Sequence, residues 1–287
     1  MIFSKRIAAV SILTSMLLLS ACEQTSDDET LNEPDQEEVE QNEESLTSDE
    51  VDESIEETSS EDTGESDSNE TDDDTSTQSD NEEPQLDLKD DVLEPSSLAV
   101  LVNKQYSLPE DYVPSDLVTV EVPTVLPNPE IKQMRIEAAD ALKDMFEAAE
   151  ESGIILHARS GYRSYQTQVQ LFQNYTESHG EEAANKYSAR AGESEHQTGL
   201  VMDVTSESVN LQISTEFGET EEGQWVSEHA HDYGFIIRYP EGKTDVTGYI
   251  YEPWHIRYLG VDLATEVHES GLTYEEYLID RGMEIEI

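Results

Sequence analysis

Residues 194–204 read SEHQTGLVMDV, and about fifty residues later the chain reads EPWHIRY at residues 252–258. Side chains alternate along a strand, so Asp203 is the polar residue of an otherwise apolar strand, LVMDV. Burying an unpaired carboxylate there is costly, and a cation is therefore expected beside it. His196 lies seven positions earlier, which on a straight helix or strand would separate the two side chains by ~10 Å or more. We therefore expect a loop that folds His196 back over the strand.

The functional side chains of these stretches have the composition of a catalytic metal site. His196, Asp203 and His255 offer zinc three nitrogen or oxygen ligands and leave a fourth position for water. Glu252 is then a spare carboxylate. Pro253 fixes φ directly after it and predicts a helical turn that brings Glu252 and His255 to the same side. A carboxylate so placed can take a proton from water whose pKa zinc lowers to ~7, and return it to a leaving amine.

The charge of the chain is concentrated in its first third. The 287 residues include 67 acidic and 15 basic ones, which gives a net charge of −52. Between Glu23 and Gln85 there is no lysine or arginine. Such a segment buries too little apolar surface to offset its ordering entropy, and its charges repel one another. It also lacks the apolar period and the countercharges of an acidic helix. We therefore expect residues 23–92 to form a disordered acidic linker.

Residues 1–22 have the features of an export signal. Lys5 and Arg6 precede an apolar run from Ile7 to Leu19, which is too short to span a ~30 Å hydrocarbon core but suits a signal peptide. The run ends in LSAC, which resembles the lipobox of bacterial lipoproteins, where Cys22 would be lipidated. Cys22 is the single cysteine of the chain, so an intrachain disulfide is excluded. An ordinary secreted protein with a chance cysteine is the alternative to a lipid-anchored protein outside the cytoplasm.

Residues 93–287 are expected to form one α+β domain, with a small, mostly antiparallel sheet flanked by helices. The first dense apolar run, LAVLVN, begins at Leu98, and a proline-rich arm follows. Apolar spacing and caps predict helices, and apolar runs predict strands. The expected helices are 131–149, 164–180, 221–233 and two short ones at the C-terminus; the expected strands lie within 153–162, 200–206, 235–240 and 248–255.

Three blocks of this sequence, SGYRSYQTQ, SEHQTGLVMD and EPWH, resemble the signatures of VanY-type D-alanyl-D-alanine carboxypeptidases. That family of zinc peptidases also includes L,D-carboxypeptidases that trim peptidoglycan stems. The resemblance covers roughly residues 100–285. It implies that His196, Asp203 and His255 bind zinc and that Glu252 is the general base.

The SGYRS block carries the expected specificity for a chain end. Arg163 can hold a terminal carboxylate in a bidentate pair. In similar enzymes the matching arginine and glutamine contact the substrate, which points to Arg163 and Gln168, with Ser194 supporting the site. From sequence alone, Arg159 and Arg190 are equally available for this role, and Arg163 is also free to pair with an acid of the domain.

The resemblance implies an enzyme that removes the last D-alanine from a pentapeptide stem ending in D-Ala-D-Ala. Three alternatives stay open: an L,D-carboxypeptidase acting on the tetrapeptide stem, an endopeptidase that cuts within the stem, and a peptidoglycan-binding lipoprotein without activity. The last would have no need of Glu252. The acidic excess of the domain should repel nucleic acid, and we expect a monomer.

The lipobox generates a test of location. Replacing Cys22 with serine removes the thiol that would carry the lipid, so the Cys22→Ser protein should move from the membrane to the soluble fraction. Cell fractionation followed by immunoblotting measures the shift. Unchanged membrane association of the variant would contradict the lipid anchor.

Overall fold

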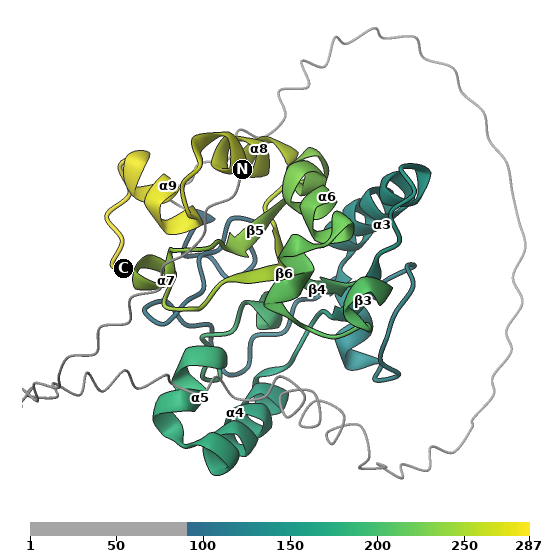
Figure 1. Cartoon of the computed structure of the whole chain (residues 1–287). Coiled ribbons are helices and arrows are strands. Elements are labelled where there is room, and N and C mark those ends of the chain that lie inside the picture. The colour runs from purple at the N-terminus through teal and green to yellow at the C-terminus, as the bar shows by residue number, and fades with distance from the viewer. Residues whose placement is uncertain (1–90) are drawn as a thin grey trace, which may run out of the picture. The chain divides into compact units, whose positions relative to one another are not determined.

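The computed structural model describes residues 91–287, and the expected signal peptide, Cys22 and nearly all of the acidic linker lie outside them. The described part contains a four-stranded antiparallel sheet in the order β3-β4-β6-β5 and a two-stranded antiparallel sheet of β1 and β2. Helices lie around these sheets (Figure 1). The expected α+β class is thereby confirmed.

The elements have the following bounds. The strands are β1 Leu117–Thr119, β2 Gln133–Arg135, β3 His157–Ser160, β4 Val201–Thr205, β5 Phe235–Tyr239 and β6 Glu252–Tyr258. The α-helices are α3 Ile136–Glu151, α4 Tyr165–His179, α5 Glu181–Tyr187, α6 Glu221–His229, α7 Thr244–Thr247, α8 Val261–Ser270 and α9 Tyr274–Asp280. Short 3-10 helices are η1 Glu130–Lys132, η2 Glu195–Thr198, η3 Glu207–Val209, η4 Thr215–Glu219 and η5 Ala230–Tyr233.

Helix α4 begins and ends where its sequence predicts. The Ser164 hydroxyl accepts a hydrogen bond from the Thr167 amide, which satisfies one free donor of the first turn. Gly180, at φ 83°, ends the helix. Helices α4 and α5 share a small apolar cluster of their own, and Figure 1 shows them packed together at one end of the domain.

The helix expected at 131–149 is wrong over its first five residues. The helix begins at Ile136, and residues 133–135 form strand β2. Strand β1, which was not expected, pairs with β2 and places Val118 opposite Met134. Met134 is fully buried in this pairing, so its spacing matches a helical period although it lies in a strand. Tertiary pairing here overrides local helix propensity.

The helical turn expected in EPWH is also wrong, because these residues begin strand β6. In an uninterrupted strand, residues three apart point to opposite faces. Along β5 and β6, however, Ile237 pairs with Ile256 and Tyr239 pairs with Glu252, so two steps on one strand match four on the other. This bulge lets Glu252 and His255 approach each other, with Glu252 Oε2 3.7 Å from His255 Nδ1.

Two apolar clusters hold the elements together. The larger one lies between the sheet and α3 and includes Met134, Leu142 and Ile256. The second joins the segment before β1 to α8 and α9. Val92, the last residue of the expected linker, is fully buried in that second cluster, so the packed part of the chain includes it. No helix within residues 91–287 has the length and apolarity needed to cross a membrane.

A buried charge network links the second cluster to the sheet. Arg238 on β5 forms a two-armed ion pair with Glu275 on α9, and its Nε donates to Glu195 at 2.8 Å. Asn103 donates to the same Glu275 carboxylate at 3.2 Å. The Arg238, Glu195 and Glu275 side chains are 0% exposed. Removing one partner from such a network leaves a buried charge without a countercharge, which is strongly destabilising.

This network predicts a specific loss of stability. The Glu275→Ala variant should lose about 3–5 kcal/mol of unfolding free energy, because Arg238 then lacks a buried partner. Urea unfolding followed by tryptophan fluorescence measures the change. The matched control is Glu121→Ala, which breaks an exposed ion pair with Lys143 and should leave stability nearly unchanged. Equal stability of the two variants would contradict the role of the network.

Candidate metal centre and substrate cavity

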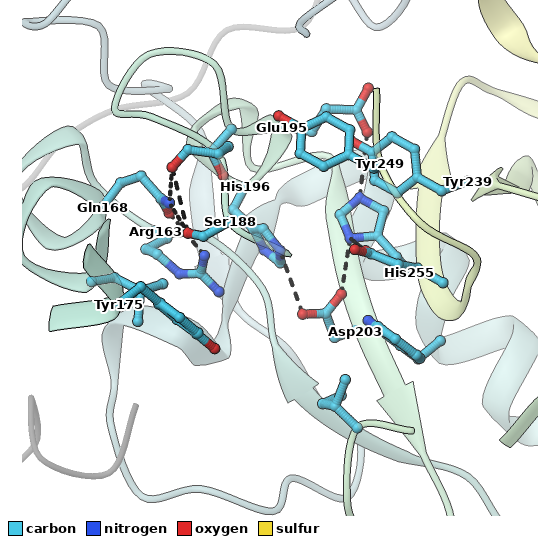
Figure 2. A pocket seen from close by; sticks show the side chains of 16 residues that line it. Arg163, Gln168, Tyr175, Ser188, Glu195, His196, Asp203, Tyr239, Tyr249 and His255 are labelled. Carbon is cyan, nitrogen blue, oxygen red and sulfur yellow. Dashed lines mark hydrogen bonds and ion pairs between the residues drawn. The ribbon is translucent and has the colours of Figure 1, made fainter. Parts of the chain in front are cut away.

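The structure brings His196, Asp203 and His255 together in one buried cluster. Each offers a ligand atom within 4.8 Å of the others. Asp203 on β4 lies directly opposite His255 on β6 in the sheet, and His196 enters from η2. Figure 2 shows the three side chains converging, with Asp203 between the two imidazoles.

Gly199 lets η2 turn into β4 so that His196 reaches the sheet. It has φ 67°, in the left-handed region that favours glycine. A Cβ at this position would lie 2.8 Å from Leu117 Cδ2 and 3.1 Å from Arg135 Cγ. The expected fold-back of His196 over the strand is thus achieved by a 3-10 turn that ends at this glycine.

The hydrogen bonds of His196 fix which ring nitrogen faces the cluster. Its Nδ1 lies 2.7 Å from the Gly161 carbonyl oxygen, which can only accept, so Nδ1 carries the proton. Its Nε2 is then unprotonated and lies 3.4 Å from Asp203 Oδ2. Burial, together with the Arg163 charge, lowers the pKa of His196 to about 3. The imidazole therefore stays neutral, as a metal ligand must be.

His255 is held from both ring nitrogens by carboxylates. Its Nε2 lies 3.4 Å from Glu195 Oε2, and its Nδ1 lies 3.0 Å from Asp203 Oδ1. Burial alone would lower its pKa, but the bonds to Asp203 and Glu195 raise it to about 9. This local field favours a positive charge, which a divalent cation at Nδ1 also supplies. Two imidazole nitrogens and one carboxylate oxygen are a donor set that fits zinc.

Glu195 is a site residue that sequence reasoning missed. Its carboxylate accepts from Arg257 Nη1 at 2.6 Å as well as from Arg238, while it holds His255. Burial would raise the pKa of Glu195, but the two arginines outweigh burial and hold the pKa well below its usual range. An arginine in each of the apolar strands FIIRY and HIRY was the available signal, because a buried arginine requires a buried acid.

Glu252 lies beside the cluster without belonging to it. It is 9% exposed, and Oε2 lies 3.7 Å from His255 Nδ1. Burial is the largest cause that raises the pKa of Glu252 to about 7, and Asp203 adds to it while His255 opposes it. Burial likewise opposes ionisation of Asp203, but His196 and His255 hold the pKa of Asp203 below its usual value. The two neighbouring carboxyl groups therefore differ in proton affinity.

Hydrogen bonds to neighbouring side chains orient Arg163. Nη1 donates to Gln168 Oε1 at 2.8 Å and Nη2 donates to Ser160 Oγ at 3.1 Å. The Gln168 amide nitrogen, Nε2, donates to the Ala189 carbonyl oxygen at 2.7 Å. Gln168 thereby positions Arg163. Of the alternatives, Arg190 pairs with Glu181 in an exposed position, and Arg159 donates to the Leu211 carbonyl.

One cavity of about 110 Å³ joins the three candidate metal ligands to Arg163. Its polar lining comprises Arg163, Gln168, Ser188, Ser194, Glu195, His196, Asp203, Glu252 and His255, and its aromatic lining comprises Tyr175, Tyr239, Tyr249 and Trp254. Figure 2 shows Arg163, Gln168 and Ser188 grouped on the opposite side of His196 from Tyr249 and Tyr239. The predicted metal ligands, Glu252, Arg163, Gln168 and Ser194 therefore all line the same cavity, whereas Arg159 and Arg190 do not.

Two imidazoles joined by a carboxylate, a second carboxylate with a raised pKa and an arginine held by hydrogen bonds are the features expected of a hydrolase that activates water at a metal. The family model described as VanY, D-alanyl-D-alanine carboxypeptidase, matches residues 131–261. YodJ, a candidate carboxypeptidase of Bacillus subtilis (strain 168), is 47% identical over 198 residues, which are 69% of this chain and 72% of YodJ. The chain belongs to the VanY family of D-alanyl-D-alanine carboxypeptidases, as its motifs predict.

Further relatives include a protein named D-alanyl-D-alanine carboxypeptidase and one named LD-carboxypeptidase. The D-alanyl-D-alanine carboxypeptidase of Enterococcus faecalis (strain ATCC 700802 / V583) is 34% identical over 188 residues, which are 62% of this chain and 65% of the relative. The LdcB LD-carboxypeptidase structure is 48% identical with a TM-score of 0.63, covering 64% of this chain and 87% of LdcB. A mutant of the vancomycin resistance D,D-pentapeptidase VanY, in complex with Zn(II), is 34% identical with a TM-score of 0.50, covering 64% of this chain and 99% of that one.

Proposed function

We propose that this protein is a zinc-dependent carboxypeptidase that removes the C-terminal D-alanine from peptidoglycan stem peptides. The observation that carries the proposal is the shared cavity, in which the His196, Asp203 and His255 cluster, Glu252 and Arg163 all meet. The related D,D-pentapeptidase binds Zn(II), and the donor set of this cluster suits the same ion.

His196 Nε2, Asp203 and His255 Nδ1 would hold the zinc. When bound, zinc supplies a Lewis acid that polarises a carbonyl oxygen and makes water acidic enough to attack at neutral pH. The Asp203 carboxylate contacts both imidazoles, and the pairing of β4 with β6 places Asp203 opposite His255. Glu195 keeps the Nε2 proton of His255 and thereby directs Nδ1 toward the cluster.

Glu252 and Arg163 divide the remaining work. Glu252 Oε2 takes a proton from the attacking water and returns it to the amine nitrogen that leaves, as a general base and then a general acid. Arg163 binds the free carboxylate of the chain end through its paired N–H groups. Because Gln168 and Ser160 fix the guanidinium, it needs little reordering when the substrate arrives. A peptidoglycan-binding protein without activity would not require Glu252.

Similarity favours the tetrapeptide stem as the substrate. LdcB, an LD-carboxypeptidase, is 48% identical to this chain, whereas the D,D-pentapeptidase and the enterococcal D-alanyl-D-alanine carboxypeptidase are each 34% identical. This ordering reverses the preference for the pentapeptide that the motifs alone suggested. The D,D activity remains the second candidate because the family takes its description from it. We place the enzyme at the outer face of the cell membrane, on the strength of the first 22 residues of the sequence.

The reaction is tested with two synthetic stems, one a tetrapeptide with a single terminal D-alanine and one a pentapeptide that ends in D-Ala-D-Ala. Zinc-loaded full-length protein should release D-alanine from the tetrapeptide faster than from the pentapeptide, as measured by mass spectrometry. Glu252→Ala should lower kcat by at least ~10²-fold, because the proton transfer is lost, while zinc stays bound.

The matched control is Glu241→Ala, which removes an exposed glutamate outside the cavity and should leave kcat unchanged. Cleavage of the pentapeptide alone would make the enzyme a D,D-carboxypeptidase. Cleavage within the stem, or equal activity on a peptide with an amidated C-terminus, would contradict the role of Arg163 and indicate an endopeptidase.

A further inference from the structure

Tyr249 has a buried hydroxyl without a hydrogen-bond partner. Its Oη is enclosed and unpaired among the described residues, and the whole residue is only 5% exposed. No other side chain that lines the cavity has a buried polar atom of this kind among the described residues. Leaving a buried donor unsatisfied costs about 1–3 kcal/mol. An orphan hydroxyl in a ligand cavity therefore suggests that the ligand supplies the partner.

The aromatic ring of Tyr249 is fixed from two sides. Lys104 Nζ lies 4.5 Å from the ring centroid, and the same ammonium donates to the Gly248 and Asn185 carbonyl oxygens. The Tyr239 ring lies 4.7 Å away on a tilted plane. Lys104 thereby connects helix α5 to the segment before β6. Ser188 follows that helix and Tyr249 lies in that segment, and both line the cavity. A phenol held this firmly is preorganised to bind.

The charges around the hydroxyl indicate which kind of partner it takes. Burial, followed by the carboxylates of Glu193, Glu252 and Glu195, raises the pKa of Tyr249 well above its ordinary value. The hydroxyl is therefore a protonated donor, and the same carboxylates disfavour an anion beside it. A neutral carbonyl oxygen suits this place better than the terminal carboxylate, which Arg163 is positioned to hold.

We propose that Tyr249 is a substrate-binding residue whose hydroxyl donates a hydrogen bond to a peptide carbonyl oxygen of the bound stem. This inference rests on the proposed function, because it takes a stem peptide as the ligand. Tyr249 would then recognise the substrate separately from Arg163 and from the three candidate metal ligands. Glu252 carries the proton transfer, so Tyr249 contributes to binding rather than to the chemical step.

The test uses Tyr249→Phe, which keeps the ring and removes only the hydroxyl. With the tetrapeptide, KM should rise about 3- to 10-fold, the range for one neutral hydrogen bond, while kcat stays within about twofold. Zinc content and thermal unfolding should match those of the unsubstituted protein. Tyr251→Phe is the matched control, because Tyr251 lies two positions away and does not line the cavity. An unchanged KM in Tyr249→Phe would overturn the proposal.

A binding measurement separates this inference from the proposed reaction. Calorimetry follows the tetrapeptide as it binds to the zinc-loaded Glu252→Ala protein, with and without Tyr249→Phe. A 3- to 10-fold weaker affinity in the double variant supports the role of Tyr249, even where the unsubstituted protein cleaves neither stem and the proposed reaction fails. Equal affinities, or no binding of the peptide to either protein, would overturn it.

Discussion

The ion pairs of Glu195 with Arg238 and Arg257 are the interaction on which the site depends. This carboxylate is fully buried and binds both arginines, and it also holds Nε2 of His255. Arg238 also donates to Glu275 on α9, and Arg257 donates to the Leu98 and Val100 carbonyl oxygens. The orientation of one imidazole is thus tied to the packing of both ends of the described chain. Desolvating so many charges gives little net stability, so we interpret the network as serving the geometry of the site.

The residues that line the cavity are held in place by two different elements, the central sheet and helix α4. Two of the three candidate metal ligands, Asp203 and His255, lie on β4 and β6, the central strands of the sheet, where cross-strand pairing fixes one against the other. The group proposed to bind the chain end, Arg163, is fixed by Gln168 on α4, a helix whose own apolar cluster lies apart from the main core. A rigid sheet suits the chemistry, which tolerates little misplacement. Lys104 spans the gap between the two walls by donating to Asn185 and Gly248.

The sequence predicts those parts of the fold in which local pattern and tertiary packing agree. Ser164 caps α4 as expected, and Asp203 has the polar position in an apolar strand that pointed to a cation. The failures have a common cause in long-range pairing. Met134 keeps a helical spacing but belongs to β2, because β1 binds there. Glu252 meets His255 through a bulge that only the register of β5 against β6 reveals. Glu195 stands inside the quoted motif, yet its role depends on arginines more than 40 positions away, with Arg238 at a separation of 43.

The most direct test of whether Glu195 orients His255 for metal binding is the zinc affinity of two variants of the buried charge network. Glu195→Gln and Glu275→Ala both remove a buried partner of Arg238, but only the first touches His255. Competition with a chelator, on full-length protein below the unfolding temperature of each variant, gives both dissociation constants. We expect zinc to bind about 10- to 100-fold more weakly to Glu195→Gln and the dissociation constant of Glu275→Ala to stay unchanged. Equal zinc affinities in the two variants would contradict the role of Glu195.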